Sequence, residues 1–302
     1  MQYYAAMHFT VELSVRGWAA DPSWIAEVAP ALDRAGFEAV GYTDHPAPSR
    51  KWLDRGGHPT FDPFAALCYV AALTERIRLM TFLAVLPYRN PLLLAKSVAT
   101  VDRLSSGRFR LVAGTGYLRS EFAALGRSFD QRNDLFEEAV DVLRHAYVAD
   151  AYQRQGHGFD ALGVAFDPPP VQLPHPPIWI GGSSRESRRR AARYGAGWAP
   201  MRTNEAFAKV VRTGLLESDD DIKIAVEELR FLVEAEGRDP SEVAVQLDGF
   251  GDLTQPADQA LEKAAALEAL GATHAIVGPP AGPAAEAVEA IERFGAEVIA
   301  VR

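Results

Sequence analysis

The alternation of short apolar runs with amphipathic stretches is the feature that most constrains the fold of this chain. Runs rich in β-branched and other apolar residues are separated by segments whose apolar residues recur with helical spacing. Several runs are apolar at consecutive positions, which is typical of strands covered on both faces in a parallel sheet. The predicted strands are residues 5–13, 39–43, 77–85, 109–113, 178–180, 197–201, 243–247 and 274–277.

The helices predicted between these strands begin and end with local signals. Asp21-Pro22 and Asp62-Pro63 each place a capping side chain before a proline at the first helical position, and Gly36 ends the first helix. Strands alternating with helices over 302 residues predict a (β/α)8 TIM barrel in the α/β class. A doubly wound open sheet is the alternative, but it usually opens with a glycine-rich turn after its first strand, which this chain lacks.

Chain length alone is compatible with two domains or with one large barrel, and we expect residues 1–302 to form a single barrel domain. Three predicted connections are too long for simple strand–helix loops, namely residues 46–62, 119–177 and 202–239. We interpret them as insertions at the C-terminal face of the strands, where they would shape the pocket of a small-molecule substrate.

Charge and cysteine content exclude several classes of protein. A net charge of −9 argues against a nucleic-acid partner, because phosphate contacts need a basic face. The longest apolar stretches, such as residues 79–87, are far shorter than a membrane span, and the first residues show no signal peptide. We therefore expect a cytoplasmic protein without a membrane partner. Cys68 is the only cysteine, and no histidine–carboxylate cluster has metal-ligand spacing, so we expect no metal site.

The strongest candidate site follows the predicted strand at residues 178–180. In a barrel, functional residues lie at the C-terminal ends of the strands. The run Gly181-Gly182-Ser183-Ser184 leads directly into a predicted helix, whose first N–H groups could bind an anion, and Arg185 and Arg188 add positive charge. Ser183 and Glu186 also match a capping box, which is compatible with an anion site. We interpret the run as a phosphate site.

Two further strand ends carry candidate residues. Asp44-His45 is a titratable pair in which the histidine suits proton transfer and the carboxylate can raise the pKa of its neighbour. A capping aspartate beside a structural histidine is an equally weighted alternative. Gly114-Thr115-Gly116 would let a flat ring lie close to the backbone, unless it is a bare turn.

Missing residue types narrow the chemistry further. No lysine lies at the end of a predicted strand, which argues against Schiff-base chemistry. No paired carboxylates stand out at two strand ends, which argues against glycoside hydrolysis. A barrel with a phosphate site and few ionisable groups suits a bound cofactor that supplies the chemistry.

Several blocks of the sequence, in the same order, resemble the bacterial-luciferase-like oxidoreductases, and within them the branch that uses coenzyme F-420. The match spans about residues 25–200, and residues 200–302 match only in general barrel layout. The resemblance implies coenzyme F-420 as the cofactor, with FMN as the alternative, and makes a homodimer possible because dimers are common in the family. The matching blocks are residues 35–45, 76–91, 99–108, 114–122 and 176–184.

The resemblance also assigns roles residue by residue. Asp44 and His45 would lie at the cofactor ring. Phe82 and Leu83 would back one ring face, with a cis peptide or a bulge between them. The ring or the ribityl chain would be lined by Gly114, Thr115, Gly116 and Tyr117, and the phosphate would be held by Gly181, Gly182, Ser183 and Ser184. Many relatives carry Ser or Gly in place of Phe82, and Trp or Glu in place of Tyr117.

Together these features favour an enzyme that transfers hydride between coenzyme F-420 and an unidentified small organic substrate, with His45 offering a proton. A luciferase-like monooxygenase that uses reduced FMN is the alternative. A non-catalytic flavin-binding protein is third, and a metal-dependent barrel hydrolase is fourth. Trp18, Trp52 and Phe61 suggest an aromatic and fairly apolar substrate pocket.

Overall fold

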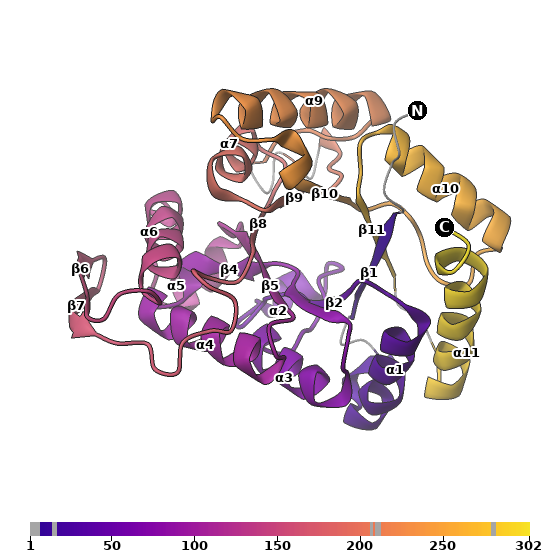
Figure 1. Ribbon diagram of the computed structural model, residues 1–302, viewed down its shortest axis with the longest axis horizontal. Helices are drawn as coiled ribbons and strands as arrows, with labels where there is room; N and C mark the ends of the chain where they lie inside the picture. Colours follow the sequence, from indigo (N-terminus) through magenta and orange to yellow (C-terminus); the bar gives the residue numbers. More distant parts are fainter. Residues whose placement is uncertain (1–6, 14–16, 206–207, 209–212, 279–281) are drawn as a thin grey trace.

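The computed structural model describes residues 7–13, 17–205, 208, 213–278 and 282–302. In this part of the chain, parallel strands form a closed barrel that is surrounded by helices (Figure 1). The strand order is β3-β2-β1-β11-β10-β9-β8-β5-β4, and pairing of β3 with β5 closes the ring. The predicted TIM barrel is confirmed, and the open-sheet alternative is wrong.

Each predicted strand is present, with small shifts at its ends. The barrel strands are β1 (His8–Glu12), β2 (Ala39–Tyr42), β3 (Arg78–Thr81), β4 (Ala84–Val85), β5 (Phe109–Gly114), β8 (Ile178–Gly181), β9 (Gly197–Ala199), β10 (Ala244–Leu247) and β11 (His274–Val277). The start of the predicted 5–13 strand, like Pro279 and Pro280 after the last strand, lies outside the described residues.

The helices begin where the sequence signals place them. The Asp21 carboxylate accepts a hydrogen bond from the Ser23 N–H at the start of α1 (Pro22–Ala35), and Gly36 ends that helix with a φ of +85°. Asp62 caps α3 (Pro63–Leu73) in the same way. The other helices are α2 (Arg50–Leu53), α4 (Pro91–Leu104), α5 (Arg119–Ala124), α6 (Arg132–His145), α7 (Arg185–Tyr194), α9 (Asp219–Ala235), α10 (Ala257–Ala269) and α11 (Ala284–Phe294).

The predicted strand 77–85 is divided into β3 and β4. The peptide bond between Phe82 and Leu83 is cis, as the resemblance implied. The chain leaves the barrel ladder at this bond and returns to it where β4 pairs with β5. Phe82 and Leu83 therefore stand out from the strand at the C-terminal end of the barrel.

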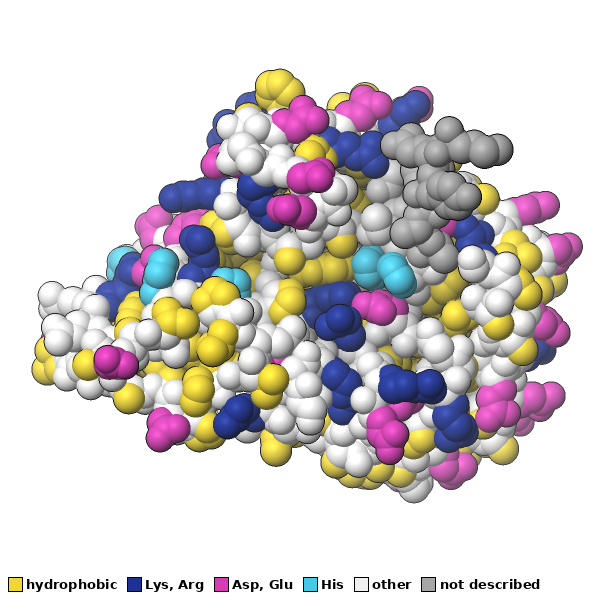
Figure 2. Space-filling model, in the orientation of Figure 1, with side chains coloured by type: hydrophobic (Ala, Val, Ile, Leu, Met, Phe, Trp, Pro, Cys, Tyr) yellow, Lys and Arg dark blue, Asp and Glu magenta, His cyan; other side chains and the backbone are white. Residues whose placement is uncertain are grey.

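The N-terminal end of the barrel is closed by a cluster of charged and aromatic side chains. The Arg110 guanidinium lies 4.1 Å from the Trp179 ring and donates to Glu38 at 3.0 Å. The His8 and His274 rings are 4.8 Å apart, and burial with Arg110 nearby lowers the pKa of His274 to about 2. Figure 2 shows acidic, basic and histidine side chains meeting at the centre of one face of the molecule. In the described structure this cluster occupies the N-terminal end of the barrel, and the cavity lined by the strand ends lies at the C-terminal end.

The longest connection contains an element that the sequence analysis missed. Residues 119–177 include α5, α6 and an antiparallel hairpin of β6 (Tyr152–Gly156) and β7 (Phe159–Val164), which lies at the edge of the molecule away from the barrel (Figure 1). β6 holds one apolar side chain, Tyr152, and Asp160 and Gly163 interrupt the apolar residues of β7, so neither strand shows the pattern on which strand prediction depends. Among the described helices, none is long and apolar enough to cross a membrane.

Candidate active site

A cavity of about 330 Å³ opens at the C-terminal ends of the strands. Side chains from the ends of β1, β2, β5, β8, β9, β10 and β11 line it, together with the segment around β4. All of the residues predicted as site residues lie on its wall: Asp44, His45, Phe82, Leu83, Gly114, Thr115, Gly116, Tyr117, Gly181, Gly182, Ser183 and Ser184. The three long connections contribute too, through His58, Arg132, Phe136 and Thr213.

At one end of the cavity, His45 is held by a buried carboxylate. Its Nδ1 lies 3.1 Å from Oε2 of Glu121, which has no solvent exposure. Glu121 also accepts hydrogen bonds from the Tyr88 hydroxyl (3.0 Å) and the Ala47 N–H (3.2 Å). Burial and this carboxylate raise the pKa of Tyr88, so the phenol stays protonated and remains a donor.

This arrangement fixes the role of each imidazole nitrogen. A carboxylate that accepts from Nδ1 places a proton there, which leaves Nε2 to exchange protons in the cavity. The prediction that the neighbouring Asp44 acts on His45 is wrong, because the carboxylate in contact with the ring is that of Glu121 on α5.

Asp44 is occupied by other contacts. It is 3% exposed, forms an ion pair with both terminal nitrogens of Arg89, and accepts the Val85 N–H at 2.9 Å. Arg89 also binds Asp62 at 3.0 Å. Asp44 thus anchors β4 and the turn before it, and the geometry favours this structural role over the predicted catalytic one.

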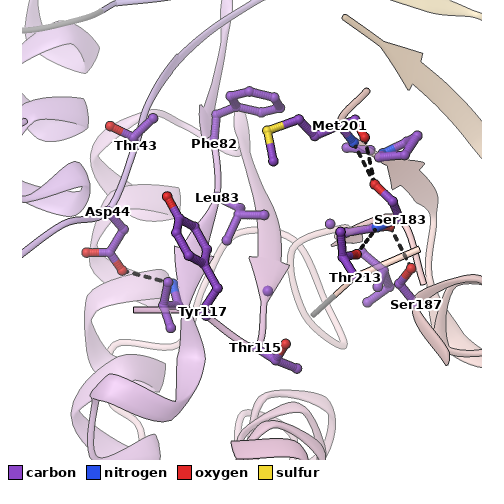
Figure 3. Close-up of a pocket in the computed structure, with 18 of the residues that line it drawn as sticks. Thr43, Asp44, Phe82, Leu83, Thr115, Tyr117, Ser183, Ser187, Met201 and Thr213 are labelled. Atoms are coloured by element: carbon purple, nitrogen blue, oxygen red, sulfur yellow. Dashed lines mark hydrogen bonds between the residues drawn. The ribbon is translucent and has the colours of Figure 1, made fainter. Parts of the chain in front are cut away.

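Leu83 fills the space above two of the predicted glycines. A Cβ added to Gly114 would lie 2.5 Å from Leu83 Cδ1, and one added to Gly181 would lie 2.3 Å from Leu83 Cδ2. These positions are therefore glycine because they accommodate Leu83, and a flat ring would contact Leu83 rather than their bare backbone. Figure 3 shows Leu83 between the Asp44 side of the cavity and the Ser183 side.

At the opposite end, the predicted phosphate run makes a sharp turn into α7. Gly182 has a φ of +102°, which favours glycine. The Ser184 hydroxyl caps α7 by accepting the Ser187 N–H at 3.1 Å, so the cap is Ser184 and the predicted Ser183–Glu186 capping box is wrong. The N–H groups of Arg185 and Glu186, the first two residues of α7, have no partner within the helix. Such groups bind anions.

The positive charge at this end comes from different arginines than predicted. Arg185 and Arg188 both bind Glu228 of α9 at 2.6 Å and do not line the cavity. Arg132 and Arg190 line it instead, and Arg190 is buried, with its Nε 2.6 Å from Glu137. The helix pattern could have indicated Arg190 as a cavity residue, because Arg190 lies on the buried face of α7 with Ser187 and Ala191.

Two carboxyl groups on the cavity wall were also missed. Glu12 is the last residue of β1, and Asp248 follows β10. Burial raises the pKa of Glu12 to about 7; nearby His45 lowers it and nearby Asp248 raises it. The expectation that no two strand ends carry paired carboxylates is therefore wrong. The sequence pattern of β1 could have indicated Glu12. Side chains two positions apart in a strand lie on the same face, and Glu12 follows His8 and Thr10 at this spacing.

The aromatic residues proposed for the pocket differ in position. The Trp52 ring lies 4.5 Å from the His45 ring, and the His58 ring lies 5.1 Å from it. Trp18 is 58% exposed, and Phe61 packs against Tyr42, so neither lines the cavity. Among the described residues, no group of three His, Cys, Asp or Glu side chains is placed to hold a metal ion.

Comparison with known proteins gives a family and a set of relatives. The family model described as "Luciferase-like monooxygenase" matches residues 4–299. An uncharacterized protein of Mycobacterium tuberculosis (strain H37Rv) is 30% identical over 79% of this chain and 77% of its own length. An uncharacterized protein of Sinorhizobium fredii is 29% identical, and the chain spans only 46% of it.

Two further matches name a cofactor. An FMNH(2)-dependent dimethylsulfone monooxygenase of Pseudomonas putida is 32% identical over 40% of this chain and 34% of its own length. The solved structure of an F420-dependent secondary alcohol dehydrogenase superimposes with a TM-score of 0.78 at 16% identity, covering 99% of this chain and 100% of that chain. At this identity the structural likeness concerns the fold.

Proposed function

Because the chain belongs to the luciferase-like monooxygenase family, we propose that it is an oxidoreductase that transfers hydride between coenzyme F-420 and a small organic substrate. The observation that carries the proposal is one cavity with an anion-binding helix start at one end and the buried Glu121–His45 pair at the other. A cofactor with a phosphate on its ribityl chain needs the first feature. A hydride transfer that leaves a heteroatom to be protonated needs the second.

The residues present fit such a cofactor. The Gly182 turn and the start of α7 would hold the phosphate, with Arg132 and Arg190 on the wall beside them. Leu83 and Tyr117 lie between the Ser183 side of the cavity and Asp44, where the ring would be placed (Figure 3). When bound, a deazaflavin would supply two-electron hydride chemistry, because it has carbon in place of the oxygen-reactive nitrogen of flavin.

The protein itself would then manage the proton. His45 exchanges a proton through Nε2, while Glu121 keeps the ring oriented. Tyr88 and the Ala47 N–H hold Glu121 in place. Trp52 covers the His45 ring and limits the access of water.

A monooxygenase that uses reduced FMN is the second candidate. The Pseudomonas putida relative, whose name states FMNH(2) dependence, supports it, and the same phosphate site would serve FMN. Absorbance titration of the purified protein with oxidised coenzyme F-420 and, separately, with FMN distinguishes the two. We expect saturable binding of coenzyme F-420 and weaker binding of FMN. The reverse order would favour the monooxygenase, and binding of neither would contradict both.

The substitution Gly182→Val is expected to remove the contribution of the phosphate to cofactor binding. Valine is strained at a φ of +102°, at a cost of about 1–3 kcal/mol, so the turn would move away from the ligand. In the parent protein, FMN should bind about tenfold to a hundredfold more tightly than riboflavin, as charge-assisted hydrogen bonds imply. In the variant this ratio should fall toward one, as measured by flavin fluorescence titration.

Gly237→Val is the matched control. Gly237 also has a positive φ, +72°, but a Cβ there meets no atom within 4 Å, and the residue does not line the cavity. It should lose similar stability and keep the parent ratio of FMN to riboflavin affinity. If Gly182→Val kept that ratio as well, the phosphate would be bound elsewhere.

A further inference from the structure

Glu12 is a carboxyl group on the cavity wall that the proposed mechanism does not use. Within β1, the side chain of His8 points to the barrel axis, since its ring meets that of His274, and Glu12 has the same parity. The strand register places Glu12 opposite Gly41 of β2, which has no side chain to cover it. The carboxyl therefore reaches the cavity from the barrel wall.

The surroundings of Glu12 provide charge but no hydrogen bond. Two titratable groups face it in the described structure, His45 after β2 and Asp248 after β10. Asp248 accepts a hydrogen bond from the Arg202 backbone N–H at 3.0 Å. The positive charge of the Arg202 side chain also acts on Asp248. No described group donates a hydrogen bond to Glu12 or forms an ion pair with it. A half-buried carboxyl that lacks a hydrogen-bond donor is stable when it keeps its proton or meets a ligand group.

We propose that Glu12 is a second proton-transfer residue of this cavity, which hydrogen-bonds the heteroatom of a carbonyl or imine substrate and protonates it during reduction. The proposal rests on the proposed function and specifies its substrate class. The substrate carbon gains a hydride with two electrons from reduced coenzyme F-420, and the carbon–heteroatom double bond becomes single. The O–H bond of Glu12 breaks as the heteroatom–hydrogen bond forms, and His45, which faces Glu12, passes the next proton from solvent to the carboxylate.

The titration of Glu12 agrees with this role. Its pKa of about 7 lets the carboxyl hold a proton and release it near neutral pH, which is the condition for efficient proton transfer. The negative charge of Asp248 opposes ionisation of Glu12 and raises its pKa. His45 favours the ionised form of Glu12 and lowers that pKa. Both neighbours therefore adjust the pH range in which Glu12 can act.

Infrared difference spectroscopy on the ligand-free protein tests the protonation without any turnover. Between pH 5 and pH 9, the parent protein should lose a protonated-carboxyl band with a midpoint near pH 7. Glu12→Gln should lack this band, and Asp248→Asn should move its midpoint to lower pH. Glu242→Gln, on the exposed turn after α9, should leave the band unchanged. An identical spectrum for the parent and Glu12→Gln would overturn the proposal.

Thermal unfolding gives a second readout. The carboxyl titrates near 4.5 in the unfolded chain and near 7 in the folded protein, so the folded state binds more protons between these values. Stability from this group therefore falls as pH rises through this window and is lost above about pH 7. The Tm of Glu12→Gln minus that of the parent should increase from pH 4.5 to pH 7 and then level off. A difference independent of pH would count against the assignment.

Turnover completes the test, with reduced coenzyme F-420 and a panel of ketones, aldehydes and imines. Glu12→Gln should lower kcat by about 10²-fold or more, while its Kd for coenzyme F-420 stays within about twofold of the parent. If the parent binds no F-420, the proposed function fails, and the infrared result still decides whether Glu12 carries the proton. If the cofactor binds and Glu12→Gln turns over like the parent, this inference fails and the proposed function stands.

Discussion

Replacement of His45 by asparagine is expected to lower turnover by about 10²–10⁴-fold at saturating cofactor, the usual contribution of a positioned general acid or base. Asparagine keeps a polar side chain in the space, but it cannot exchange a proton at the position of Nε2. Steady-state kinetics should therefore show a loss in kcat with a cofactor Kd near that of the parent. A large loss of cofactor affinity with an unchanged rate would instead make His45 a binding residue.

Two variants separate the proton-transfer role from general disruption. His145→Asn makes the same change at a side chain that is 55% exposed on α6, and it should leave turnover unchanged. Glu121→Gln keeps the shape of the partner but removes its charge, so it should lower kcat because the His45 ring loses the group that orients it. Parent-like kinetics for His45→Asn would show that the proton comes from another group.

The substitution Asp44→Ala is expected to destabilise the protein by about 3–5 kcal/mol, because it leaves the Arg89 guanidinium partly buried without its main partner. The same change removes the acceptor of the Val85 N–H, which holds β4 at the end of the barrel. Chemical denaturation followed by circular dichroism should show the loss as a lower midpoint at pH 7.

Asp62→Asn is the matched control for this ion pair. Asp62 also binds Arg89, but its side chain is 51% exposed, and exposed ion pairs contribute about 0–1 kcal/mol. Asparagine can still cap α3. If Asp44→Ala were as mild as Asp62→Asn, the pair would not anchor β4, and the catalytic role predicted for Asp44 would regain support.

The fold and the outline of the site could be predicted because their signals are local. The Asp-Pro starts of α1 and α3 and the consecutive apolar residues of the barrel strands are readable within a few positions. In a TIM barrel the strand ends converge, so each motif found after a strand reaches the same cavity. The hairpin at β6 and β7 was missed because β6 holds one apolar side chain, Tyr152, and because Asp160 and Gly163 interrupt the apolar residues of β7.

The contacts within the site depended on pairs that are distant in sequence. Local patterns predict that a histidine, a glycine pair and an anion-binding helix start lie around one barrel mouth. Which groups contact one another there depends on how the chain folds. His45 meets Glu121, which is 76 positions away, while Asp44 beside it turns to Arg89. Neighbouring residues in extended backbone project to opposite sides, so adjacency in the chain separates side chains that barrel closure can bring together from different strands.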